Sequence, residues 1–230
     1  MDIHKPKPWR GWREFLKEYA IIVVGVLTAL AGEQAVETMN WRHEVAETEK
    51  ALQAELGHNA RSQLWRLEQS GCVRARLADL QAWRDSIAAG RPLKPIAPIG
   101  QPVWYGYSQD SWSVAQTGQV AAHIPLERRI KYAELYNSAE KQTEQQVRES
   151  DLWHALHEFE GAGDLDHHDL MRLQGLMASI EGAQNNYALN YPAAKVRWIA
   201  LGITPEAKNP QAKARGIVAA ELCRRMFAAG

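Results

Sequence analysis

The first thing this 230-residue sequence lacks is an excess of charge of one sign. Lys and Arg total 27, Asp and Glu also total 27, and the formal net charge is zero. Proteins that bind nucleic acid usually carry a basic excess or patch that neutralises phosphates. The balance therefore gives no reason to expect a nucleic-acid partner.

The motifs of common catalytic sites are missing as well. The sequence contains no G-x-S-x-G, no glycine-rich phosphate loop and no H-E-x-x-H. No stretch shows the alternation of apolar and polar residues that predicts a half-buried strand. We therefore expect an all-α fold and lean against an enzyme, although a catalytic domain with an unfamiliar site stays open.

Cysteine is scarce, and neither Cys72 nor Cys223 belongs to a C-x-x-C pair. In an oxidising compartment the two could form one disulfide that closes a long loop. Two separate buried thiols are the alternative, and the spacing does not decide between them.

A long uncharged run dominates the N-terminal part of the chain. Tyr19 to Gly32 contains no charged residue and no proline, and its flanks extend the apolar character over residues 12–36. About 20 mostly apolar residues are needed for a helix to cross a bilayer. We interpret residues 12–36 as a transmembrane helix, with residues 1–11 as a cytoplasmic tail.

The charges around this run predict its orientation. Basic residues precede it, and acidic residues outnumber Arg42 just after it. The positive-inside tendency then places the N-terminus in the cytoplasm and the rest of the chain outside, in the periplasm of a bacterium with two membranes. Three alternatives are open: a signal peptide cleaved at Ala29-Leu30-Ala31, a buried core helix, and a helix lying in the membrane interface.

The block REFLKEYAIIVVGVLTALAGEQAVE, followed by Trp41-Arg42 and a charged helix, resembles the N-terminal signature of a family of uncharacterised bacterial membrane proteins. Their anchor has the form E-x-x-I-V-V-x-G-V-L-x-A-L and precedes a helical domain. The similarity covers residues 9–60 and is weaker over 111–136. It implies a single-pass inner-membrane protein of unknown function and brings no catalytic residues.

The remaining chain has the pattern of an antiparallel helical bundle. Residues 37–89 form a long amphipathic segment, with an interruption expected at Gly57 or Gly71. Residues 90–106 hold four prolines and predict an extended strap across the helices, with a partner-binding polyproline segment as the alternative. Residues 107–230 carry further helices, including one ending near Glu160, one ending before Pro192, and a last helix over 211–227; they are expected to pack with 37–89 as one domain.

One cluster has the residue types of a metal site. The segment Asp151–Asp169 contains His154, His157, Asp164 and His167, and imidazole with carboxylate suits zinc, iron or manganese. The spacing matches no specific metal motif, and a helix junction with capping and surface residues is the alternative. A di-iron site using Glu55-x-x-His58 lacks its further carboxylates. No other cofactor is indicated.

The anchor itself has a face of small residues, formed by Gly25, Thr28, Ala29 and Gly32. Such faces let helices approach closely in lipid. We therefore expect a non-catalytic, membrane-anchored interaction or accessory subunit of an envelope complex, whose partners are lipid, another membrane protein or further copies of itself. A metal-binding or catalytic helical domain using Asp151–Asp169 is the alternative function.

Overall fold

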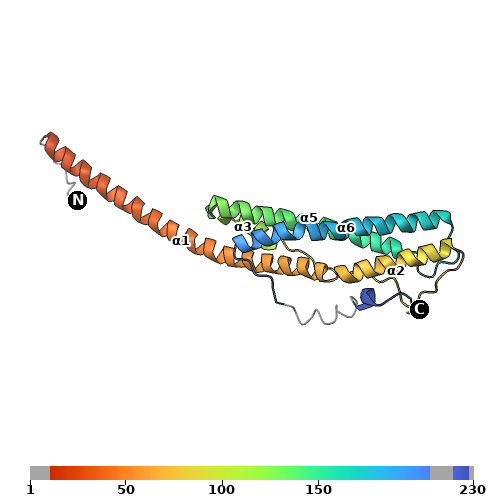
Figure 1. The fold of residues 1–230 in the computed structure, drawn as a ribbon. Helices are drawn as coiled ribbons and strands as arrows, with labels where there is room; N and C mark the ends of the chain where they lie inside the picture. Colours follow the sequence, from red (N-terminus) through yellow and green to blue (C-terminus); the bar gives the residue numbers. More distant parts are fainter. Residues whose placement is uncertain (1–10, 208–219, 228–230) are drawn as a thin grey trace, which may run out of the picture. The chain divides into compact units, whose positions relative to one another are not determined.

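The computed structural model describes residues 11–207 and 220–227, and all regular structure in these ranges is α-helical, which confirms the all-α prediction. The helices are α1 (Trp12–Glu68), α2 (Ser70–Ala88), α3 (Asp110–Thr117), α4 (Val120–His123), α5 (Leu126–His157) and α6 (His167–Ala200) (Figure 1). The chain divides into two units, Met1–Glu47 and Thr48–Gly230. The predicted cytoplasmic tail, except Gly11, and most of the predicted last helix lie outside the described residues.

The first unit contains the N-terminal part of α1. Its large apolar side chains point into open space, and Ile21, Ile22 and Leu27 are each more than half exposed. A helix that is apolar all round is stable only where an apolar medium or a partner covers it. The alternative of a buried core helix is therefore not met, because no part of the apolar window of α1 is buried inside the structure.

In the second unit, α1 ends and α2 begins around a single non-helical residue, Gln69. The expected interruption is thus close to Gly71, while Gly57 lies inside α1. A structural reason is visible at Gly57, whose position is buried against the chain that follows α6. The Gly57 carbonyl accepts a hydrogen bond from the Glu206 amide at 2.9 Å, so the glycine allows a close contact and does not break the helix.

Helices α5 and α6 pack antiparallel along their length. Arg197 pairs with Glu134 near one end, Gln145 donates to the Ala183 carbonyl in the middle, and Arg172 pairs with Glu158 near the other end. α5 runs in the same direction as α1 and α2, since Glu49 contacts Arg128 and Arg66 contacts Glu149. The core between them is rich in aromatic and aliphatic side chains, including Trp83, Trp153, Phe159, Leu173 and Ile180.

α6 continues through Pro192 to Ala200, so the expectation that Pro192 ends the helix is wrong. Proline removes one backbone hydrogen bond from a helix. Here Ala194 and Trp198 are buried beyond Pro192, and Pro192 itself is exposed. Burial of the following turns offsets the missing bond. At its start, α6 has a capping box between Asp166 and Asp169.

Residues 90–109 form an extended strap across the helices. The side-chain amide of Gln69 donates to the Val103 carbonyl and accepts from the Val103 amide, both at 2.8 Å. Asn59 makes the same paired contact with Ser108, at 2.8 and 2.9 Å. Buried backbone groups need partners, and here side-chain amides replace the neighbouring strand that a sheet would provide.

The segment 220–227 lies between α2 and the strap, and Cys72 forms a disulfide with Cys223. One face of α2 holds this segment at successive turns. Arg76 donates to the Leu222 carbonyl at 3.2 Å, and Asp79 accepts from the Met226 amide at 2.8 Å. Within this segment the helix covers residues 220–223, so it ends before the predicted end at Phe227. Arg76 donates to the carbonyls of Glu221, Leu222 and Arg224 at this end.

Gly57→Ala tests the close contact at α1. A Cβ atom at Gly57 would lie 2.7 Å from the Thr204 carbonyl oxygen, whereas at Gly71 it meets nothing within 4 Å. We expect Gly57→Ala to lower the free energy of unfolding by about 1–3 kcal/mol, as overpacking does, and Gly71→Ala to leave it unchanged or raise it by up to about 1 kcal/mol. Urea denaturation of the full chain measures both, and equal stabilisation by both would contradict the contact.

Candidate functional sites

The apolar part of α1 is long and apolar enough to span a membrane. Gly25 and Gly32 have no neighbouring atom within 4 Å of an added Cβ, and the Thr28 hydroxyl donates to the Val24 carbonyl at 2.8 Å. Ala29 is exposed beside them. The four small residues thus form an open face with its polar group satisfied inside the helix, and that face is accessible to another helix.

A second feature is a charged pair in the core of the 48–230 unit. The side chains of Arg66 and Glu149 have no exposed surface, and the guanidinium makes two contacts with the carboxylate. The third guanidinium nitrogen, Nη1, donates to the Gln184 side-chain oxygen at 2.8 Å. Removing charges from water costs several kcal/mol per ion, so such a pair persists only where further hydrogen bonds complete it.

Tryptophan and tyrosine side chains complete this network. The indole nitrogens of Trp104 and Trp153 donate to Glu149 at 3.1 and 3.4 Å, and the guanidinium of Arg66 lies 4.8 Å from the centre of the Tyr187 ring. Burial raises the pKa of the Tyr187 hydroxyl, and the charge of Glu149 adds to the effect. Tyr187 therefore stays neutral at physiological pH and presents its ring face to the cation.

The network joins every major element of the unit. Arg66 belongs to α1, Glu149 to α5, Gln184 to α6 and Trp104 to the strap, and Gln184 donates to the Ser70 hydroxyl on α2 at 2.6 Å. Its central members, Arg66, Glu149 and Gln184, are buried. Its arrangement is that of a structural connection between helices.

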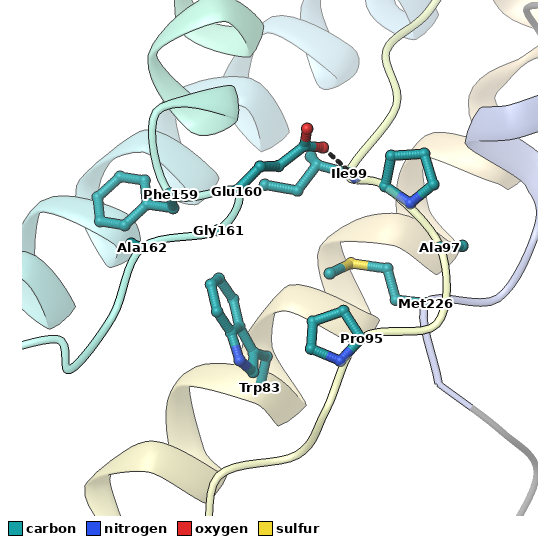
Figure 2. A pocket seen from close by; sticks show the side chains of 10 residues that line it. Trp83, Pro95, Ala97, Ile99, Phe159, Glu160, Gly161, Ala162 and Met226 are labelled. Carbon is teal, nitrogen blue, oxygen red and sulfur yellow. Dashed lines mark hydrogen bonds between the residues drawn. The ribbon is translucent and has the colours of Figure 1, made fainter.

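A pocket of about 280 Å³ opens between the end of α2, the strap and the end of α5 (Figure 2). Its lining is almost entirely apolar and consists of Trp83, Pro95, Ala97, Pro98, Ile99, Phe159, Glu160, Gly161, Ala162 and Met226. Glu160 is the charged group, and it already accepts a hydrogen bond from the Ile99 amide and lies 3.1 Å from His157 Nδ1. Small-molecule sites usually exceed about 300 Å³ and have several converging polar groups, so this pocket is small and weakly equipped.

The structure does not bring the predicted metal ligands together. Among residues 11–207 and 220–227, no three His, Cys, Asp or Glu side chains are placed to share a metal ion. His157 faces Glu160, and His167 contacts His168. Asp166 and Asp169 bond each other's backbone amides at the start of α6. Helix capping accounts for these two carboxylates, and neither His154 nor Asp164 joins a set of ligands.

Glu55 and His58, the pair considered for a di-iron site, contact different parts of the chain. Glu55 accepts hydrogen bonds from the Ser108 hydroxyl at 2.7 Å and the Ser111 amide at 3.0 Å. Burial opposes the shift, but these bonds lower the pKa of Glu55, so it is a carboxylate at neutral pH. His58 Nδ1 lies 3.0 Å from Glu206. The carboxylate therefore holds the start of α3, and the histidine contacts the chain after α6.

Comparison with known proteins gives no relative: no family model matches the sequence, and no curated protein or solved structure matches it. Sequence reasoning placed the small residues of α1 on one face, and the role of that face in helix packing stays a prediction. It missed the Arg66–Glu149 network. Arg66 lies among other charged residues of a long helix, and the spacing of apolar residues does not indicate that this arginine is buried.

The buried pair makes a quantitative prediction. Arg66→Met leaves the Glu149 carboxylate buried without its cation, and we expect a loss of about 3–5 kcal/mol in the free energy of unfolding. Arg66→Met combined with Glu149→Leu removes both charges and is expected to lose less than the sum of the two single changes. Arg197→Met, which breaks an exposed pair with Glu134, is the control and should cost less than about 1 kcal/mol. Denaturation followed by tryptophan fluorescence tests this; additive losses would show that the pair is not coupled.

Proposed function

We propose that this chain is a single-pass inner-membrane protein whose helical domain lies in the periplasm and serves as a non-catalytic interaction or accessory subunit of an envelope complex. The observation that carries the proposal is the uncovered apolar part of α1, in which most of the large side chains are exposed and none is buried. In water this surface would be strongly unfavourable, and a bilayer covers it without any further protein.

Two further observations support the compartment. The basic excess before the apolar run and the acidic excess after it favour an outward C-terminal domain. The Cys72–Cys223 disulfide agrees with that side of the membrane, because disulfides persist in the periplasm and are rare in the cytoplasm. The resemblance of residues 13–37 to anchors of uncharacterised bacterial membrane proteins fits the same arrangement.

The interaction role is supported by the kinds of surface present. In the 48–230 unit the charged pair is buried, the strap is bonded to the helices, and the pocket is small and almost entirely apolar. The small-residue face at Gly25, Thr28, Ala29 and Gly32, by contrast, is uncovered. In lipid, helix association depends on close packing at such faces, so we assign recognition of another membrane helix to this face.

A reporter fusion tests the orientation. A reporter active only in the periplasm, fused after Gly230, should be active, and the fusion should stay in the membrane fraction after an alkaline wash because α1 spans the bilayer. Activity from a cytoplasmic reporter alone would reverse the topology. Release of a shortened protein by the wash would show cleavage after Ala31.

Substitutions in the anchor test its packing face. Gly25→Ile or Ala29→Ile adds bulk where close approach is needed, and we expect weaker co-purification of neighbouring membrane proteins after mild detergent extraction. Insertion should be unaffected, because added aliphatic carbon favours the bilayer. Val23→Ile, on the side of the helix opposite that face, is the matched control. If all three variants retain the same neighbours, α1 serves only as a tether.

A further inference from the structure

The disulfide between Cys72 and Cys223 lies at the surface of the 48–230 unit. Cys223 is exposed, as are Arg224 and Arg225 after it, whereas Cys72 is half-buried in the first turn of α2. A thiolate in solution can therefore approach the Cys223 side chain. Exposed disulfides are the ones that exchange with other thiols, whereas most structural disulfides resist reduction.

The contacts around the disulfide hold the segment 220–227 in place without it. Asp79 accepts a hydrogen bond from the Met226 amide at 2.8 Å, and the Ile96 amide donates to the Met226 carbonyl at 2.7 Å. Leu222 and Met226 are each 1% exposed and belong to the core. These contacts do not depend on the sulfur–sulfur bond, so the two cysteines stay close together in the reduced chain and can pair again.

The side chain of Arg76 lies beside both cysteines and is incompletely bonded. Arg76 follows Cys72 by one turn of α2, a spacing that places two side chains on the same face. Its Nη2 donates to the carbonyls of Leu222 and Arg224, the residues on either side of Cys223. Its Nε and Nη1 are buried and have no hydrogen-bond partner in the described part of the chain. Buried donors without partners are rare and destabilising.

A thiolate at Cys72 would give these donors an acceptor and a counter-charge. Burial lowers the pKa of Arg76, and the charges of Asp79 and Glu160 oppose this shift only in part. Reduction places a negative charge one turn before Arg76, within the first turn of α2, where the helix N-terminus also favours an anion. The other charged side chains within one turn of either cysteine in sequence are Glu68, which pairs with Arg61, and Arg74, Glu221, Arg224 and Arg225, which pairs with Asp79.

We propose that Cys72 and Cys223 are a redox-active pair that accepts two electrons from a protein dithiol. A thiolate of the dithiol attacks Cys223 Sγ, the bond between the two cysteines breaks, and Cys72 leaves as a thiolate beside Arg76. The second thiolate of the dithiol then attacks its own sulfur in the mixed disulfide and releases Cys223, which takes up a proton. The dithiol is oxidised to a disulfide, and this chain is reduced.

Stabilisation of the leaving thiolate makes the disulfide a stronger oxidant, because the reduction potential rises when the reduced form is favoured. The inference uses only residues of the 48–230 unit. It does not rest on the proposed membrane anchor or on the interaction role.

Reduction of the folded full chain tests the exchange. Reduced thioredoxin, used as the probe dithiol, should reduce the pair without denaturant, and both thiols should then react with a maleimide of high mass that shifts the chain on a gel. The chain has no other cysteine, so the shift reports this pair alone. Circular dichroism should be the same before and after reduction. A pair that is reduced only in urea, or a chain that loses its helices on reduction, would show that the disulfide is a structural cross-link.

The variant Arg76→Met tests the role of the guanidinium in glutathione redox buffers. Loss of thiolate stabilisation should shift the equilibrium about tenfold toward the disulfide, which is about 30 mV for a two-electron couple. Arg74→Met, an exposed position on the same helix, should change it by less than about twofold.

The direction of the shift separates this effect from a loosened segment. Asp79→Asn weakens the contacts to Met226 and Arg225 and leaves Arg76 in place. Loosening lowers the effective concentration of one thiol beside the other, so this variant should shift the equilibrium toward the reduced form. If Arg76→Met also shifts it toward the reduced form, or matches Arg74→Met, Arg76 only holds the segment and the proposal is wrong.

Discussion

The buried ion pair between Arg66 and Glu149 constrains the whole 48–230 unit. Two charges without exposed surface are tolerated only if both are surrounded by polar partners, and here those partners come from different elements. Gln184 fixes α6 against the pair, Trp104 fixes the strap and Ser70 fixes the start of α2. A displacement of α6 or of the strap would leave a buried charge with fewer hydrogen bonds, and a displacement of α2 would leave the Gln184 amide without its partner. Apolar packing alone would permit helices to slide or rotate, whereas this network defines one register between them.

The strap depends on the same principle of satisfying buried polar groups. A segment with four prolines cannot supply regular backbone hydrogen bonds of its own, so the helices supply them through Asn59 and Gln69. Gln69 is also the residue at which α1 gives way to α2. Gln69 therefore bonds the strap at the position where α1 ends and α2 begins.

Much of the fold can be predicted from sequence because helical periodicity and the residues that end helices are local signals. Each of them determines the structure of nearby residues only. Examples are the uncharged run before Glu33, the prolines between residues 90 and 106 and the cap at Asp166. Whether Cys72 and Cys223 are bonded could not be decided this way, because local signals do not say whether two segments separated by most of the domain meet. The metal cluster failed for a related reason: nearness of His154 to His167 in sequence says nothing about where their rings point. Pro192 shows that tertiary burial, here of Ala194 and Trp198, can override a local helix breaker.

The core side of α6 combines apolar packing with one polar contact at its middle. Leu173, Met177 and Ile180 fill the apolar core, whereas Gln184 accepts from Arg66 and donates to Ser70. The ring of Tyr187, one turn further along, faces the Arg66 guanidinium. The polar contact fixes the position of α6 along its own axis relative to α1 and α2, because sliding by one turn would leave the Arg66 guanidinium without its third partner. Apolar burial on both sides of that contact then holds the helix together, and Ala194 and Trp198 extend this burial beyond Pro192.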